Sequence, residues 1–131
     1  MKRFAVAIST AAALLAGCAT MPDAVAVDPA FDPAATEFTG WVRVSGGEFQ
    51  LYAEQRQLSE PFSRPCASGA LPRNAQRTAQ DLSGSQVTFT GRAAPWSDRD
   101  GVQTLMHEGS RISNQCRGAF VIKADSVRVL R

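Results

Sequence analysis

Apolar and polar positions alternate with a period of two from Phe38 onward. Over residues 38–44 an apolar or small residue occupies every second position, and Thr39, Trp41 and Arg43 lie between them. This period predicts a β-strand with one buried face. The adjacent glycines of residues 45–47 favour a tight turn, because glycine adopts positive φ without strain. Residues 49–53 then alternate again, so the sequence predicts a β-hairpin over 38–53.

The rest of the chain predicts further strands and one helix. Residues 73–82 contain good helix formers and few β-branched residues, which favours a short helix. Residues 55–65 are polar and proline-containing, which indicates a loop. A loop as long as residues 93–118 is uncommon without structure of its own, so a short strand is expected within it. The expected strands after the hairpin are 66–71, 86–92, 102–107 and 119–130.

Two stretches resemble the OB-fold domains of bacterial envelope proteins. LSGSQVTFTGRA is similar to the Leu-x-Gly-x-x-Val-x-Val-x-Gly run that leads into their fourth strand, and FVIKADSVRVL is similar to their fifth strand. The resemblance implies a mainly all-β domain over residues 38–131, folded as a small five-stranded Greek-key barrel with one short helix. A small β-sandwich is the alternative.

The first residues have the order of an export signal. Lys2 and Arg3 precede an apolar run over 4–15, which is too short for a membrane span of about 20 residues. The following Leu15-Ala16-Gly17-Cys18 resembles the lipobox of bacterial lipoproteins. That resemblance implies that residues 1–17 are a cleaved signal peptide and that Cys18 carries a lipid anchor, including an acyl chain such as palmitate. In that family Asp after the cysteine is the usual signal for retention in the inner membrane. Ala19 therefore favours the outer membrane, with the protein facing the periplasm.

Residues 18–37 are rich in Ala, Pro and Asp and have no periodic apolar face. We expect them to form a flexible tether between the lipid and the domain. The alternative is a first strand packed on the domain.

Charge changes along the chain. The precursor has 14 Lys+Arg and 12 Asp+Glu, and removal of residues 1–17 takes away two basic groups and no acids. The mature chain is therefore neutral, so the basic precursor is no argument for nucleic-acid binding. Residues 38–131 nevertheless retain 12 basic and 8 acidic groups, a net charge of +4.

Cysteine usage predicts one disulfide. If Cys18 is lipidated, Cys66 and Cys116 remain as an even pair in an oxidising compartment. A metal site would need further ligands, and His107 is the only histidine. The bridge would close a loop of about 50 residues, worth about 4 kcal/mol in the chain-entropy model.

No catalytic motif, metal site or cofactor site is predicted. His107 and Glu108 are neighbours in an expected strand and should point to opposite faces. The hairpin offers one expected binding face for a planar or sugar-like ligand, because four side chains share the parity opposite the apolar rows: Trp41, Arg43, Gln50 and Tyr52. The alternative is that Trp41 covers a barrel edge and Tyr52 caps the core.

These features predict a non-enzymatic lipoprotein of the cell envelope that binds a protein partner or a small envelope ligand. Nucleic acid is not expected as a partner. A structural accessory of an envelope complex and a small hydrolase with an unrecognised site are the alternatives.

Overall fold

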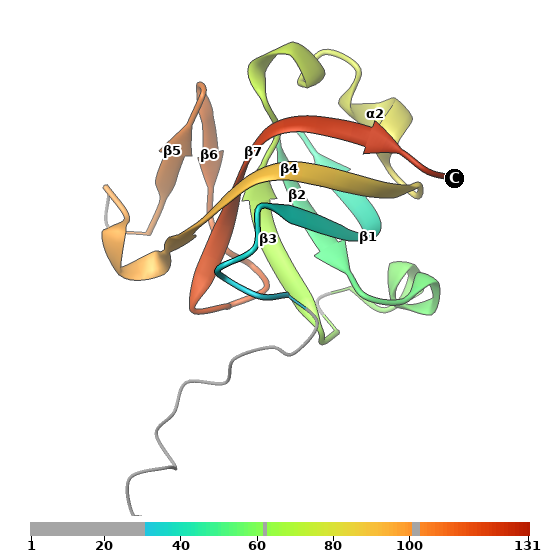
Figure 1. Ribbon diagram of the computed structural model, residues 1–131, viewed down its shortest axis with the longest axis horizontal. Coiled ribbons are helices and arrows are strands. Elements are labelled where there is room, and N and C mark those ends of the chain that lie inside the picture. The colour runs from blue at the N-terminus through green and yellow to red at the C-terminus, as the bar shows by residue number, and fades with distance from the viewer. Residues whose placement is uncertain (1–30, 62, 101–102) are drawn as a thin grey trace, which may run out of the picture.

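A computed structural model describes residues 31–61, 63–100 and 103–131. The signal peptide, Cys18 and the first part of the expected tether lie outside these residues. Among the described residues, five strands form a closed barrel in the order β1-β2-β3-β7-β4 (Figure 1). Their bounds are β1 Glu37–Ser45, β2 Glu48–Tyr52, β3 Cys66–Ala70, β4 Gln86–Pro95 and β7 Phe120–Val129. No helix in the described part of the chain has the length and apolar character needed to cross a bilayer.

The strand pairing confirms the OB-like barrel. Neighbouring strands run antiparallel except β3 and β7, which close the barrel in parallel through Gly69↔Ile122 and Ala70↔Lys123. The single-turn helix α2, Ala79–Leu82, lies between β3 and β4 in the sequence. The small β-sandwich is therefore wrong, since one sheet closes on itself.

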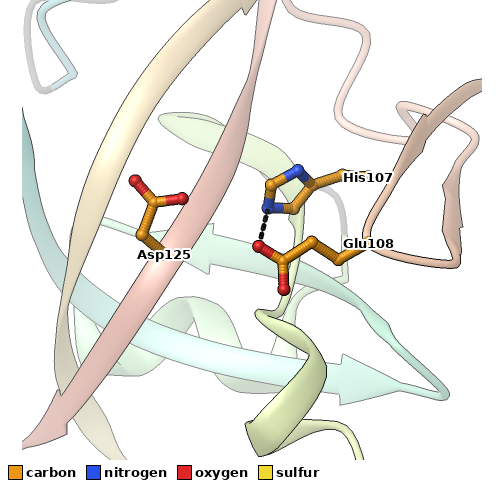
Figure 2. Close-up of side chains that lie close together, drawn as sticks. All are labelled: His107, Glu108 and Asp125. Carbon is orange, nitrogen blue, oxygen red and sulfur yellow. Dashed lines mark ion pairs between the residues drawn. The ribbon is translucent and has the colours of Figure 1, made fainter.

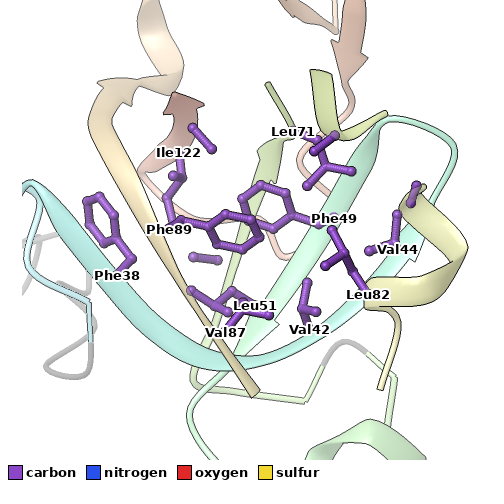
Figure 3. Close-up of a cluster of buried hydrophobic side chains, with 14 of the residues drawn as sticks. Phe38, Val42, Val44, Phe49, Leu51, Leu71, Leu82, Val87, Phe89 and Ile122 are labelled. Carbon is purple, nitrogen blue, oxygen red and sulfur yellow. The ribbon is translucent and has the colours of Figure 1, made fainter. Parts of the chain in front are cut away.

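The register of the predicted hairpin places its apolar rows inside the barrel. Val42 pairs with Leu51 and Val44 with Phe49, and all four side chains are buried. Figure 3 shows the rings of Phe49 and Phe89 against each other in the core, with centroids 4.0 Å apart. Full burial of such a side chain stabilises the fold by about 2 kcal/mol.

A β-bulge interrupts the β4–β7 pairing at the point where the barrel bends. Thr90 pairs with Ser126 and Gly91 with Ala124, so Asp125 is the extra residue on β7. A Cβ at Gly91 would collide with the carbonyl oxygen of Lys123, which explains glycine at this position. A bulge bends its strand and re-aims the side chain of the extra residue.

The predicted tether, residues 18–37, extends too far toward the C-terminus. Phe31 is only 2% exposed and belongs to the main hydrophobic core. Ala35 is partly buried against the same core. The domain therefore begins by Phe31 rather than at residue 38, because an aromatic ring shortly before β1 finds an apolar surface to cover.

Three expected elements differ in detail. The polar loop contains the 3₁₀ helix η2, Gln55–Ser59, organised around the buried Gln57 amide, which donates to the carbonyl oxygens of Ser63 and Pro65. The expected helix over 73–82 divides into the 3₁₀ turn η3, Arg73–Ala75, and α2. The strand expected over 102–107 is shorter, β5 Leu105–His107, and pairs with an unpredicted β6, Ser110–Ile112.

Candidate functional site

The C-terminal part of the segment between β4 and β7 is bonded to the barrel. It consists of the 3₁₀ turn η4, Trp96–Asp98, the β5–β6 hairpin, and the loop 113–118. The predicted Cys66–Cys116 disulfide is present and joins this loop to β3, with Cα atoms 5.5 Å apart. Beside it, the backbone amide of Cys116 donates a hydrogen bond of 3.0 Å to Oγ of Ser68. The disulfide and this hydrogen bond hold the loop against the barrel wall.

A carboxylate from β2 secures the other end of the same loop. Glu48 accepts hydrogen bonds from the backbone amides of Ser113, at 2.9 Å, and Asn114, at 3.2 Å. Asn114 has a positive φ of 58° and closes a turn with Gly118, whose amide and carbonyl both bond to the Asn114 side chain. Asparagine tolerates this left-handed conformation better than most residues. Loop 113–118 is thus bonded at both ends and internally.

An open groove lies along this loop, with a volume of about 1010 Å³. Side chains from three parts of the chain line it: the loop before β3, the segment after β4, and loop 113–118. We call it the arginine groove. Its described lining residues are Arg64, Trp96, Arg99, Gln103, Ser113, Asn114, Gln115, Cys116, Arg117 and Gly118.

The lining of the arginine groove is positively charged. It includes three arginines and no carboxylate among the described residues. The guanidinium carbon of Arg99 lies 5.6 Å from the ring centroid of Trp96, a cation–π distance. Arg64 and Arg117 form no ion pair with any residue that the structure describes. Their donors therefore remain available to an external anion.

The expected hairpin face is only partly where the sequence placed it. Trp41 faces Tyr52, and Arg43 faces Gln50, so the four do share the outer face of the barrel. However, Tyr52 is 0% and Gln50 is 3% exposed, and Tyr52 clusters with both bridging cysteines. The expectation of an exposed binding face is therefore wrong for these two residues. Leu58 of η2 and the bridged Cys66 and Cys116 pack against Tyr52 and cover this part of the face.

Trp41 and Arg43 are half-buried. Arg43 Nε is a buried nitrogen without a hydrogen-bond partner in the described part of the chain. Neither residue lines the arginine groove. The hairpin face is thus mainly a packing surface, which favours packing, rather than ligand binding, as the role of Tyr52.

The separation expected for His107 and Glu108 is also wrong. Nε2 of His107 lies 3.7 Å from Oε2 of Glu108. Glu108 is not in a strand but in the turn between β5 and β6, where its φ of 49° breaks the alternation. A positive-φ residue before Gly109 is the conformation of a tight hairpin turn.

The three groove arginines were not predicted as a set. They are 35 and 18 residues apart along the chain, and none belongs to a motif. The available signal was the net charge of +4 over residues 38–131, which is compatible with an anionic partner and with an ordinary solvated surface, and which locates no site. Bringing Arg64 to Arg117 requires the β3–β7 closure and the disulfide.

Comparisons with known proteins give no family for this chain. No protein-family model matches it, and neither does any curated protein or solved structure.

Proposed function

We propose that this protein is a non-enzymatic lipoprotein of the bacterial outer membrane, anchored at Cys18, whose barrel binds an anionic envelope ligand in the arginine groove. The lipobox resemblance supports the anchor and the location. The observation that carries the binding function is the set Arg64, Arg99 and Arg117 around one groove, without a carboxylate among its described lining.

Arginine suits this role for a chemical reason. Its planar guanidinium presents several donors in a fixed fork, which matches the two oxygens of a carboxylate or phosphate. Three such groups around one groove favour a ligand with more than one negative charge. Salt screens exposed charges beyond about 8 Å, so the attraction depends on close contact within the groove.

Trp96 adds a surface for the uncharged part of the ligand. Its ring is half-buried in the lining, with Arg99 stacked over it. The groove is at the upper end of the size range of small-molecule sites, about 300–1000 Å³, and it is open. Such a site accommodates a compact polyanion or a short stretch of an anionic polymer.

The test is a titration of the full chain in detergent with two polyanionic probes, an oligoglutamate peptide and inositol hexakisphosphate. These probes distinguish carboxylate from phosphate chemistry. We expect at least one of them to bind. We expect the triple variant Arg64→Gln, Arg99→Gln, Arg117→Gln to lose about tenfold or more in affinity, since each charged contact contributes about 1 kcal/mol or more.

Arg111→Gln is the matched control. Arg111 is exposed on β6 and does not line the groove, so its loss removes the same charge elsewhere. If Arg111→Gln and a single groove variant lower the affinity for the probes equally, the attraction comes from the general charge of the domain and not from the groove. Absence of binding to both probes, or unchanged binding by the triple variant, would contradict the proposed function.

A further inference from the structure

At the tip of the β5–β6 hairpin, a histidine and two carboxylates converge (Figure 2). One ligand atom from each of His107, Glu108 and Asp125 lies within 4.8 Å of the others. His107 is 8% exposed, whereas both acids are exposed. Its Nε2 also lies 2.8 Å from the carbonyl oxygen of Ala124. One imidazole nitrogen, two carboxylates and a backbone carbonyl oxygen therefore lie close together at the surface of the barrel.

We infer that this cluster is a binding site for a divalent transition-metal ion such as zinc. Zinc is bound by histidine nitrogen at about 2.0–2.1 Å and by carboxylate oxygen at about 2.0–2.2 Å. Two ligands of one tetrahedral ion then lie about 3.4 Å apart, from those bond lengths. The separation of 3.7 Å between Nε2 of His107 and Oε2 of Glu108 is close to this value.

The β7 bulge supplies an independent argument. Asp125 is the extra residue of the bulge and has no partner in the β4–β7 register. Asp125 lies on the exposed side of β7, opposite to the buried Ala124, and its carboxylate lies beside His107 and Glu108. Bulges are over-represented next to functional sites. The bulge thus leaves Asp125 outside the strand pairing at the point where it meets the other two residues.

The carboxylate of Glu108 is held in place by the η3 turn. Oε1 of Glu108 accepts a hydrogen bond of 2.7 Å from the backbone amide of Arg73, which leaves Oε2 toward His107. Such outer contacts orient metal ligands. Among the described residues, neither Glu108 nor Asp125 forms a salt bridge with lysine or arginine. A cation between them would relieve the repulsion of two neighbouring negative charges.

The proton on His107 must move for the metal to bind. A carbonyl oxygen only accepts, so Nε2 carries the hydrogen in its contact with Ala124. In the metal complex Nε2 is a ligand and the hydrogen resides on Nδ1.

The metal would fasten the hairpin tip to β7. Loop 113–118 is held at the other end of β6 by the disulfide and by Glu48. The inferred site is distinct from the arginine groove, because none of its three residues lines that groove. Binding at the two sites can therefore be measured separately.

The experiment is a titration of the untagged full chain with Zn²⁺, followed by the imidazole ¹⁵N NMR signals. His107 is the only histidine, so these signals are unambiguous. We expect one equivalent to bind, with a large shift of Nε2, transfer of the hydrogen to Nδ1, and a rise in Tm. We expect Asp125→Asn and Glu108→Gln each to weaken binding tenfold or more.

The two substitutions are isosteric and lie at exposed positions, so they should preserve the fold. Asp81→Asn, which removes an exposed carboxylate on α2, is the control and should leave Zn²⁺ affinity unchanged. The inference is overturned if the wild-type chain binds no Zn²⁺. It is equally overturned if Zn²⁺ binds without moving the Nε2 signal, or if both cluster variants bind as tightly as Asp81→Asn.

Discussion

The carboxylate of Glu48 accepts hydrogen bonds from both the backbone amide and the hydroxyl of Ser113, 65 residues further along the chain. This contact joins the start of β2 to the loop that lines the arginine groove. It is a charge-assisted contact to backbone as well as side chain, which is stronger than a neutral hydrogen bond.

Glu48→Gln should therefore lower the free energy of unfolding by about 2 kcal/mol, because the amide replaces a charged acceptor of several hydrogen bonds. It should also weaken anion binding, since loop 113–118 carries Arg117. Urea denaturation and probe titration measure the two effects. Glu60→Gln is the control, because the only ion pair of Glu60 with a described residue is an exposed one with Arg56, four residues earlier. A Glu48→Gln variant no less stable than Glu60→Gln would show that this contact does not anchor the loop.

The disulfide should be the main contact that keeps loop 113–118 ordered. Replacing Cys66 and Cys116 by serine opens a loop with a sequence separation of 50 and should cost about 4 kcal/mol. Protein isolated from cells should have no titratable thiol at these positions under denaturing conditions. Affinity for the groove probes should fall with the loss of the bridge, since Cys116 itself lines the groove. Two alkylatable thiols at these positions in freshly isolated protein would contradict the pairing in the cell.

Phe31 should behave as a core residue rather than as part of a tether. Phe31→Ala removes a ring that is 2% exposed and should cost about 3 kcal/mol or more in the free energy of unfolding. Thr36→Ala, at an exposed position of the same segment, should change stability by less than about 0.5 kcal/mol. Thermal or urea unfolding distinguishes the two. If both variants are equally stable, residues 31–36 belong to the tether and not to the folded domain.

Lipidation at Cys18 is a separate prediction from the lipobox. Mass spectrometry of membrane-extracted protein should find an N-terminus at Cys18 that carries acyl mass. Cys18→Ala should block both lipid attachment and cleavage, so unprocessed precursor should accumulate. A mature N-terminus at another residue, without acyl mass, would remove the anchor from the proposed function.

The barrel was predictable mainly because its first strand alternates strictly between buried and more exposed positions. In β1, Phe38, Val42 and Val44 mark the buried face, and a register slip by one residue would expose all of them. The disulfide was predictable from cysteine parity and the expected compartment alone. Both signals are local or compositional, so they can be recognised without knowledge of the tertiary structure.

The site was not predictable in the same way. Parity places Tyr52 outward, but only the tertiary packing of the bridged cysteines covers it. The meeting of His107 with Asp125 depends on a turn at Glu108 and a bulge in β7, and neither follows from a period of two. The short helix expected over 73–82 is present only in part, as η3 and α2, because propensity is weak against the demands of a short connection between barrel strands.

The position of Phe31 has a geometric consequence for a domain anchored at Cys18. Phe31 lines a small cavity together with Arg64 and Gly118, and both of these residues also line the arginine groove. The chain therefore leaves the barrel beside the groove, and residues 18–30 span at most about 45 Å when fully extended. Anchored at Cys18, the barrel would hold the groove near the membrane surface, and the length of residues 18–30 would set how far above that surface the groove can reach.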